Sequence, residues 1–175
     1  QDERKDFDTL FYQMAGNAAV SPTSLQTQGR KILVPQAALA KGICRFSFES
    51  LCQKALGAAD YLTIGQHFHT IFVQDVPTMK LAHLNWIRRF ITFVDSCYEN
   101  HCKLIILAKA RPEELLAIDK DTEHDEVFAF DRTISRLEEM SSQKYLQKQR
   151  PYDMDVESKA EMLSHRRATV DVVPS

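Results

Sequence analysis

The segment spanning residues 68–116 constrains the fold of this chain more than any other. Two short apolar runs, residues 70–73 and 103–107, flank a longer segment whose apolar residues recur at helical spacing. A tight hairpin cannot join runs this far apart, so we expect neighbouring parallel strands linked by a right-handed helical crossover. Ligands of such sheets bind at the carboxyl ends of the strands. Asp75, just beyond the first run, therefore marks where chemistry is expected.

Composition places the chain among globular proteins. Hydrophobic residues make up 44% and charged residues 26% of 175 residues, enough for one domain with a core. The formal net charge of -2 gives no attraction to nucleic acid or to an anionic membrane. The four cysteines are too sparse for a disulfide scaffold, which favours a reducing compartment. No apolar run approaches the roughly 20 residues that span a bilayer.

The amino-terminal half alternates between helical and strand patterns. We expect a helix over residues 6–15, a loop at Ser21-Pro22-Thr23, and two short strands within residues 25–34 that turn at Gly29-Arg30. Pro35 should end the second of these strands. Clean alternation predicts a half-buried strand over residues 43–48, and a helix with Leu62 and Phe68 inward should follow over 57–68.

The carboxyl-terminal half continues the same pattern. The crossover helix should bury one apolar stripe: Leu84, Ile87, Ile91, Val94 and Tyr98. Pro112 should open a short helix, and residues 117–125 should form a surface loop. Residues 127–130 are predicted to form a last strand, and Asp131 to cap the helix after it. The fold class is therefore α/β, a parallel-containing sheet with flanking helices over residues 1–150, and residues 151–175 are expected to be a polar, loosely ordered tail.

Motifs for nucleotide phosphate are missing from this sequence. No G-x-x-x-x-G-K-[ST] pattern occurs, and none of the five scattered glycines opens a phosphate-binding loop. Asp75 resembles a metal-positioning Walker B aspartate, but Val76 stands where a second acid is usual. The alternative, which is the commoner use of such a residue, is that Asp75 caps the following turn.

Four arginines are candidates for catalytic sensor or finger roles. Arg88 and Arg89 are adjacent on the polar edge of the crossover helix, whereas Arg132 and Arg136 are one turn apart on the last helix. A guanidinium group projecting from a helix could reach a γ-phosphate. The more general alternative is ion pairing on the surface, with Asp95 or Glu138 as partner.

A metal or redox site is the least favoured interpretation. Cys97, His101 and Cys102 lie close together in sequence, with His67 and His69 upstream, but their spacing matches no strong zinc pattern. Packing of Cys97 on a helix face and of Cys102 at a strand start explains these residues more simply. Cys44 and Cys52 are expected in the core, and no metal is expected.

Several blocks of sequence in order resemble one known family. The blocks GICRFSFESLC, LGAADYLTIGQHFHTIFVQDVP, RRFITFVDSCYENHCKLI and FAFDRTISRLEEMSSQKYL are similar to the carboxyl-terminal half of the ZapE/AFG-one-like ATPases (lactation elevated protein one), over about residues 7–146. The resemblance implies a P-loop, AAA+-like architecture whose Walker A and Walker B motifs precede this region. The chain departs from the family pattern at Trp86-Ile87, Lys109 and Ser141-Ser142.

The resemblance also implies a function. Full-length members bind ATP and Mg²⁺, but this segment alone is expected to bind neither and to be inactive. Eukaryotic members are mitochondrial and act in quality control of inner-membrane and respiratory-chain proteins, whereas bacterial members act at the division site in the cytoplasm. Partners would then be protein clients and not nucleic acid, and a homo-oligomer is allowed. The alternative is a non-enzymatic interaction or scaffold module that has lost nucleotide chemistry.

Overall fold

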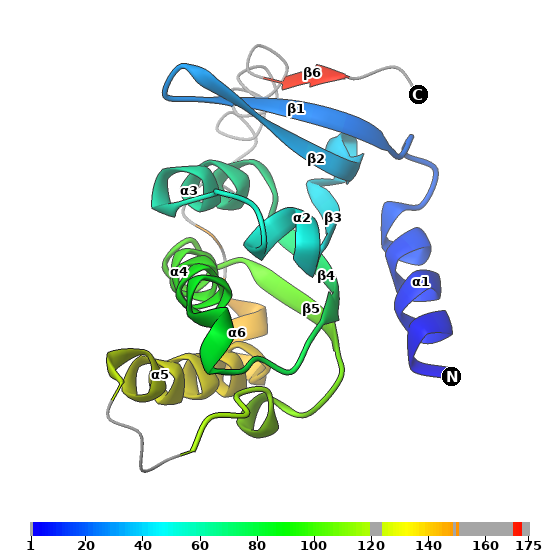
Figure 1. Cartoon of the computed structure of the whole chain (residues 1–175). Helices are drawn as coiled ribbons and strands as arrows, with labels where there is room; N and C mark the ends of the chain where they lie inside the picture. The colour runs from blue at the N-terminus through cyan, green and yellow to red at the C-terminus, as the bar shows by residue number, and fades with distance from the viewer. Residues whose placement is uncertain (1, 120–123, 149, 151–169, 173–175) are drawn as a thin grey trace.

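A mixed β-sheet forms the centre of the computed structural model, which describes residues 2–119, 124–148, 150 and 170–172 (Figure 1). Within these residues the sheet has six strands in the order β5-β4-β3-β2-β1-β6. Parallel pairing joins three of them, β3 (Ile43–Ser47), β4 (Thr70–Val76) and β5 (Lys103–Ala108). Antiparallel pairing adds the others, β2 (Arg30–Ala38), β1 (Ser21–Thr27) and β6 (Val170–Val172).

The predicted strand–helix–strand unit is confirmed. Ile71 lies opposite Leu104 and Val73 opposite Ile106 in a parallel ladder. The crossover consists of a 3-10 turn, η2 (Leu81–His83), followed by helix α4 (Leu84–Glu99). The α/β class with flanking helices is therefore correct.

Helices cover both faces of the sheet, and two apolar cores result. Helix α1 (Asp2–Ala15) packs alone on one side in Figure 1, where Phe7 and Phe11 contact Phe72. The larger core lies on the other side, beneath α2 (Phe48–Cys52), α3 (Ala58–His67), α4, α5 (Asp125–Met140) and α6 (Gln143–Gln147). Short 3-10 turns, η1 (Leu39–Lys41) and η3 (Pro112–Glu114), complete the described elements, and η3 confirms the short helix expected at Pro112.

The predicted strand over residues 127–130 is wrong, because this segment belongs to α5. Phe130, Thr133 and Met140 are its buried positions, a helical spacing that turns one face toward α4, whereas Phe128 is 67% exposed. A run of four apolar residues suits a strand or a buried helix turn equally well, so its periodicity could not decide. Because α5 begins at Asp125, the predicted capping role of Asp131 is also wrong. Asp125 was expected in the loop over 117–125, and residues 120–123 of that loop lie outside the described residues.

Two predictions that rested on proline as a strand breaker are wrong. Ser21-Pro22-Thr23 is the start of β1 and not a loop. Strand β2 continues through Pro35, which sits where the register with β1 shifts. A strand tolerates proline at such an irregularity because no ladder hydrogen bond needs its missing N–H. A turn does join the two strands, but it lies at Gln28 and Gly29, one residue before the predicted Gly29-Arg30, and Arg30 begins β2.

Burial differs from expectation at several positions. Strand β3 is buried on both faces, because α1 covers the side expected to be solvated. Leu62 is 45% exposed, and Tyr61 and Ile64 are the inward residues of α3. On α4 the predicted stripe is correct for Ile87, Ile91 and Val94, whereas Leu84 and Tyr98 are only partly buried. Most of the expected tail, 151–169 and 173–175, lies outside the described residues.

Candidate functional site

Polar side chains gather at the carboxyl edge of the three parallel strands. Strands β3, β4 and β5 end there at Ser47, Val76 and Ala108, and α1 from the start of the chain reaches the same edge through Arg4 and Asp8. This is the edge at which α/β sheets bind ligands. The sequence placed Asp75 here correctly, but its surroundings come from elements far away along the chain.

Asp75 occupies an unusual backbone position. Its φ is +60°, inside β4, at the point where the register with β5 shifts between Val73 and Val76. Aspartate tolerates this left-handed conformation better than most residues. Its half-exposed carboxylate forms an ion pair with Arg4 of α1, 71 positions away in sequence. The residue thus joins strand β4 to α1.

Arg45 is the charged residue that sequence reasoning missed. It is only 8% exposed, donates from Nε to Gln74 Oε1 at 2.7 Å, and pairs with Asp8 of α1. Its guanidinium also lies over the Phe7 ring, 4.9 Å from the centroid. A buried charge needs such partners. An arginine on an alternating strand is the signal that could have revealed it.

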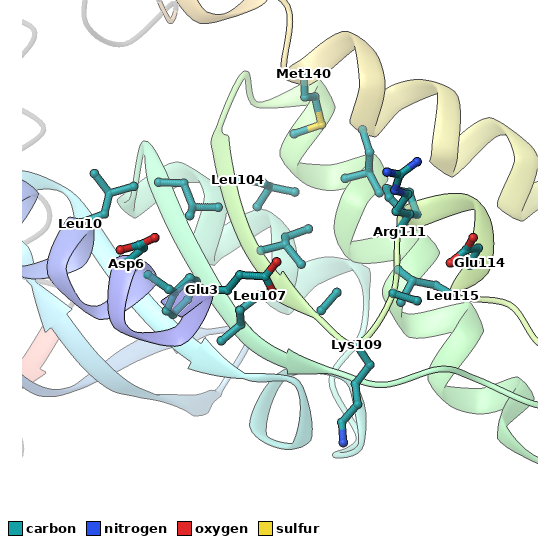
Figure 2. Close-up of a pocket in the computed structure, with 17 residues that line it drawn as sticks. Glu3, Asp6, Leu10, Leu104, Leu107, Lys109, Arg111, Glu114, Leu115 and Met140 are labelled. Carbon is teal, nitrogen blue, oxygen red and sulfur yellow. The ribbon is translucent and has the colours of Figure 1, made fainter. Parts of the chain in front are cut away.

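Among the described residues, two hollows lie beside this edge. The smaller, about 450 Å³, is polar and lies over Arg45 and Gln74, with Asp8 and Tyr12 of α1 on its rim. The larger, a groove of about 760 Å³, follows β5 between α1 and α5 (Figure 2). Its lining includes acids of α1, apolar side chains of β5 and α5, and the bases Lys109 and Arg111.

The four candidate arginines bind helices to one another. Arg132 contacts Asp95 at 3.3 Å, and Arg136 contacts the same carboxylate and, at 3.9 Å, Glu99. The guanidinium of Arg136 also lies 4.7 Å from the ring centroid of Tyr98. These contacts join α5 to α4, and Asp95 is one of the two ion-pair partners expected from the sequence.

Arg88 and Arg89, which are adjacent on α4, contact different helices. Arg88 Nε donates to Glu126 Oε1 at 2.6 Å, again between α4 and α5. A hydrogen bond from its own backbone N–H, together with Arg88, lowers the pKa of Glu126. Arg89 donates to the Cys52 carbonyl at 3.2 Å, at the end of α2. Among the described residues, none of the four arginines forms a hydrogen bond or ion pair with Asp75, so the structure does not assemble these candidates into one site.

The cysteines behave as core residues. Cys44, Cys52, Cys97 and Cys102 are all fully buried, as expected. Burial raises the pKa of Cys97, whereas a hydrogen bond from Cys97 and the nearby Arg150 lower the pKa of Cys102. His67 and His69 bond to Thr63 and Thr70. Within the described ranges, no three His, Cys, Asp or Glu side chains converge as metal ligands.

The described sheet and its helices define an α/β protein, a class whose ligands generally bind at the carboxyl ends of parallel strands. The chain belongs to the AFG1-like ATPase family, whose model matches residues 1–149. Among the helices of the described ranges, none is long and apolar enough to cross a membrane.

Relatives occur in bacteria and eukaryotes. The chain is 32% identical over 146 residues to the cell division protein ZapE of Escherichia coli, covering 83% of this chain and 37% of that protein. It is 30% identical over 173 residues to lactation elevated protein 1 homolog B of Danio rerio, covering 82% and 34%. An uncharacterised Schizosaccharomyces pombe protein is 35% identical over 141 residues, covering 67% and 31%. The chain thus spans about a third of these relatives, and no solved structure matches it significantly.

Proposed function

We propose that this chain is the carboxyl-terminal portion of an ATP-binding and ATP-hydrolysing AAA+-like protein that acts in mitochondrial protein quality control. The observation that carries the proposal is the match of the AFG1-like ATPase family to residues 1–149 of the chain. The chain would couple hydrolysis to a protein client and would not itself hold the nucleotide.

ATP and Mg²⁺ belong, in this proposal, to residues outside the segment. The sequence has no glycine-rich loop followed by lysine, so it lacks the backbone N–H groups that cradle phosphates. Asp75 offers one carboxylate, and Arg4 already partners it. A Mg²⁺ site for nucleotide would need further ligands and the phosphates themselves.

An ATP titration tests whether nucleotide binding depends on residues outside this segment. We expect the 175-residue chain alone to show no micromolar affinity for a fluorescent ATP analogue, and no hydrolysis above background. The full-length protein should bind the same analogue with Mg²⁺ present. Micromolar binding by the isolated segment would contradict the assignment of nucleotide contacts to the rest of the protein.

Arg132 is the best candidate among the arginines for a contact with nucleotide. Its side chain is 57% exposed and pairs, among the described residues, with Asp95 alone, whereas Arg136 is 22% exposed and contacts two acids and a ring. If Arg132 acts as a finger in the full-length protein, Arg132→Ala should lower kcat by roughly 10³-fold or more without unfolding. Near-normal turnover in the folded variant would assign it to the α4–α5 contact.

Location and clients are proposed from the family resemblance. Mitochondrial inner-membrane and respiratory-chain proteins would be the clients in a eukaryotic source, and the bacterial cytoplasm would be the location in a bacterial one. One relative carries the name cell division protein, so the family includes more than one setting. Import of the full-length protein into isolated mitochondria, followed by cross-linking to inner-membrane proteins, tests the mitochondrial assignment.

The second candidate function is a protein-interaction or scaffold module without nucleotide chemistry. The groove beside β5 favours it, because a strand edge without a partner among the described strands lies there beside apolar side chains, surroundings in which a polypeptide strand can bind. The reading frame upstream of Gln1 separates the two functions. A G-x-x-x-x-G-K-[ST] sequence there would support the ATPase, and its absence from the full-length protein would support the scaffold.

A further inference from the structure

We propose that the groove beside β5 binds an extended segment of a partner protein as an added β-strand, with apolar and basic residues alternating along that segment. The groove is the hollow of about 760 Å³ between α1 and α5. Binding of this kind needs no nucleotide, so it stands independently of the ATPase function proposed above.

The backbone of β5 provides the hydrogen-bonding edge. Lys103 and Lys109 donate their N–H groups toward β4, to the carbonyls of His69 at 2.8 Å and Val76 at 3.0 Å. Because backbone direction alternates along a strand, the N–H and C=O groups of Leu104, Ile106 and Ala108 point away from the sheet. Strand β5 is the last in the sheet order, and no described strand pairs with it on that side.

The edge carries little of the protection that usually blocks strand addition. Between Leu104 and Ala108 the strand contains no proline and no charged residue, and its side chains are partly buried. Exposed edges of this kind are templates for another chain unless a protein blunts them. A free edge set between two walls favours a single added strand, which is how peptides bind by β-augmentation.

The two walls differ in character, and this difference specifies the partner. Toward α5, an added strand would meet an apolar surface: Leu104, Ile106, Leu115, Leu137 and Met140. Toward α1 it would meet Phe7 and Leu10 together with two acids, Glu3 and Asp6 (Figure 2). Successive side chains of a strand point to opposite faces, so the partner should alternate apolar and basic residues.

The charged residues of the groove are solvent-exposed and available to a partner. Glu3, Asp6, Lys109, Arg111 and Glu114 form no ion pair with another described residue, whereas Arg4 and Asp8 on the same α1 helix are both paired. Basic side chains of a partner would complement Glu3 and Asp6, and an acidic residue would complement Lys109 and Arg111 beyond the strand end. A volume of 760 Å³ lies in the range of about 300–1,000 Å³ for pockets that enclose a ligand.

A second copy of this chain fits the groove less well. Antiparallel pairing of two β5 strands would place α1 of both copies on the same face of the joined sheet. The strand that a second copy would add, β5, carries no basic residue between Leu104 and Ala108 that could complement Glu3 and Asp6. The charge pattern therefore selects a basic partner segment.

Fluorescence anisotropy with synthetic peptides tests the proposal on the 175-residue chain. The probe is a labelled nonapeptide that alternates valine and lysine and ends in aspartate. Two matched peptides carry N-methyl groups, one on its valines and the other on its lysines. Only one set of N–H groups can face β5, so we expect one N-methyl peptide to lose about ten-fold or more in affinity and the other to bind nearly normally.

Three protein variants, one of them a control, provide independent evidence. Ala108→Pro removes an outward N–H, a place where an edge strand accepts proline, and should weaken binding about ten-fold. Ala108→Ser is its control and should bind normally, and equal melting temperatures would show that both variants fold. Glu3→Gln with Asp6→Asn should also weaken binding, and the difference from wild type should shrink at high salt.

Three results would overturn the proposal. The first is no binding of the unmodified probe, and the second is equal binding of all three peptides, which would indicate attraction by charge alone. The third is a dimer, seen by sedimentation, that Ala108→Pro abolishes, because the groove would then hold a second copy of the chain.

Discussion

Asp95 is the residue on which the contact between α4 and α5 centres, because it accepts from both Arg132 and Arg136. Arg136 is the better buried of the two and also lies over the ring of Tyr98. Exposed ion pairs contribute about 0–1 kcal/mol, and a cation–π contact adds about 0.5–1 kcal/mol. We therefore expect Arg136→Ala to cost about 1–2 kcal/mol and Arg132→Ala less than about 0.5 kcal/mol.

Urea unfolding of the two variants, each also combined with Asp95→Asn, measures the coupling of each arginine to the carboxylate. The coupling should be larger for Arg136. Equal costs for the two alanine variants would show that Asp95 does not discriminate between them.

His101 should make stability depend on pH. Burial, with Lys148 adding to it, lowers the pKa of His101 below its ordinary value of about 6.5. As pH falls below about 6.5, the unfolded chain takes up the proton first, so this contribution to stability is present above that pH and is lost as pH falls through the folded-state pKa. His101→Asn removes the titration, and asparagine accepts the φ of +57° found here.

Thermal unfolding at about pH 7.5 and about pH 5.5, on either side of the ordinary histidine pKa, measures the effect. The melting temperature of the wild-type chain should drop more between these conditions than that of His101→Asn. Identical drops would assign the pH dependence to other groups.

In helix α4 the periodic pattern of apolar residues predicts burial correctly at the centre of the helix but not at its start. Ile91 is 7% exposed in the core, whereas Leu84 at the start of the helix is only partly buried. Ile91→Ala should therefore cost about 2–5 kcal/mol, the usual range for a buried large-to-small change, and Leu84→Ala clearly less. Chemical denaturation of both variants measures this difference. A larger cost at Leu84 would mean that the amino-terminal end of the helix packs more tightly than its centre.

Helix α5 shows the limit of the same reasoning. Its first turns carry a valine and two phenylalanines, residue types that favour strands, and the sequence alone predicted a strand there. Packing against α4 and the ion pairs to Arg88 and Asp95 make it a helix. Tertiary contacts overrode local propensity in a segment too short to show its period.

Helix α1 determines how the whole molecule covers its sheet. It packs on the face opposite α2–α6, and Phe11 is fully buried there, 5.1 Å from Phe72 between ring centroids (Figure 1). Phe11→Ala should cost about 3–5 kcal/mol. Tyr12→Ala is the matched control, because Tyr12 is 54% exposed and its loss should cost less than about 1 kcal/mol.

Urea unfolding with a hydrophobic dye present tests both α1 variants. Phe11→Ala should unfold at lower urea and bind more dye, because the face of β3–β5 beneath α1 becomes exposed. If the two variants behaved alike, α1 would not contribute to the core of the folded chain.

Some residues of the candidate site could be predicted from the local sequence pattern, and others could be found only in the folded structure. Asp75 was predicted at the sheet edge because a strand end is visible in the sequence. The ion pair of Asp75 with Arg4 could not be predicted, because the two residues lie 71 positions apart and only the packing of α1 brings them together. Arg45 was missed because a charged residue on a strand is expected in water until a helix is known to cover it.

The sequence by itself determined the α/β class, the parallel pairing of β4 with β5 and the buried stripe of α4. These follow from spacing and periodicity, which are properties of neighbouring residues. Only the tertiary structure decided that residues 127–130 are helical and that the candidate arginines join helices. It also decided that no strand of the described residues pairs with the outer edge of β5 between α1 and α5. Each of these depends on groups that are distant in sequence, and their contact energies arise only when the chain has folded.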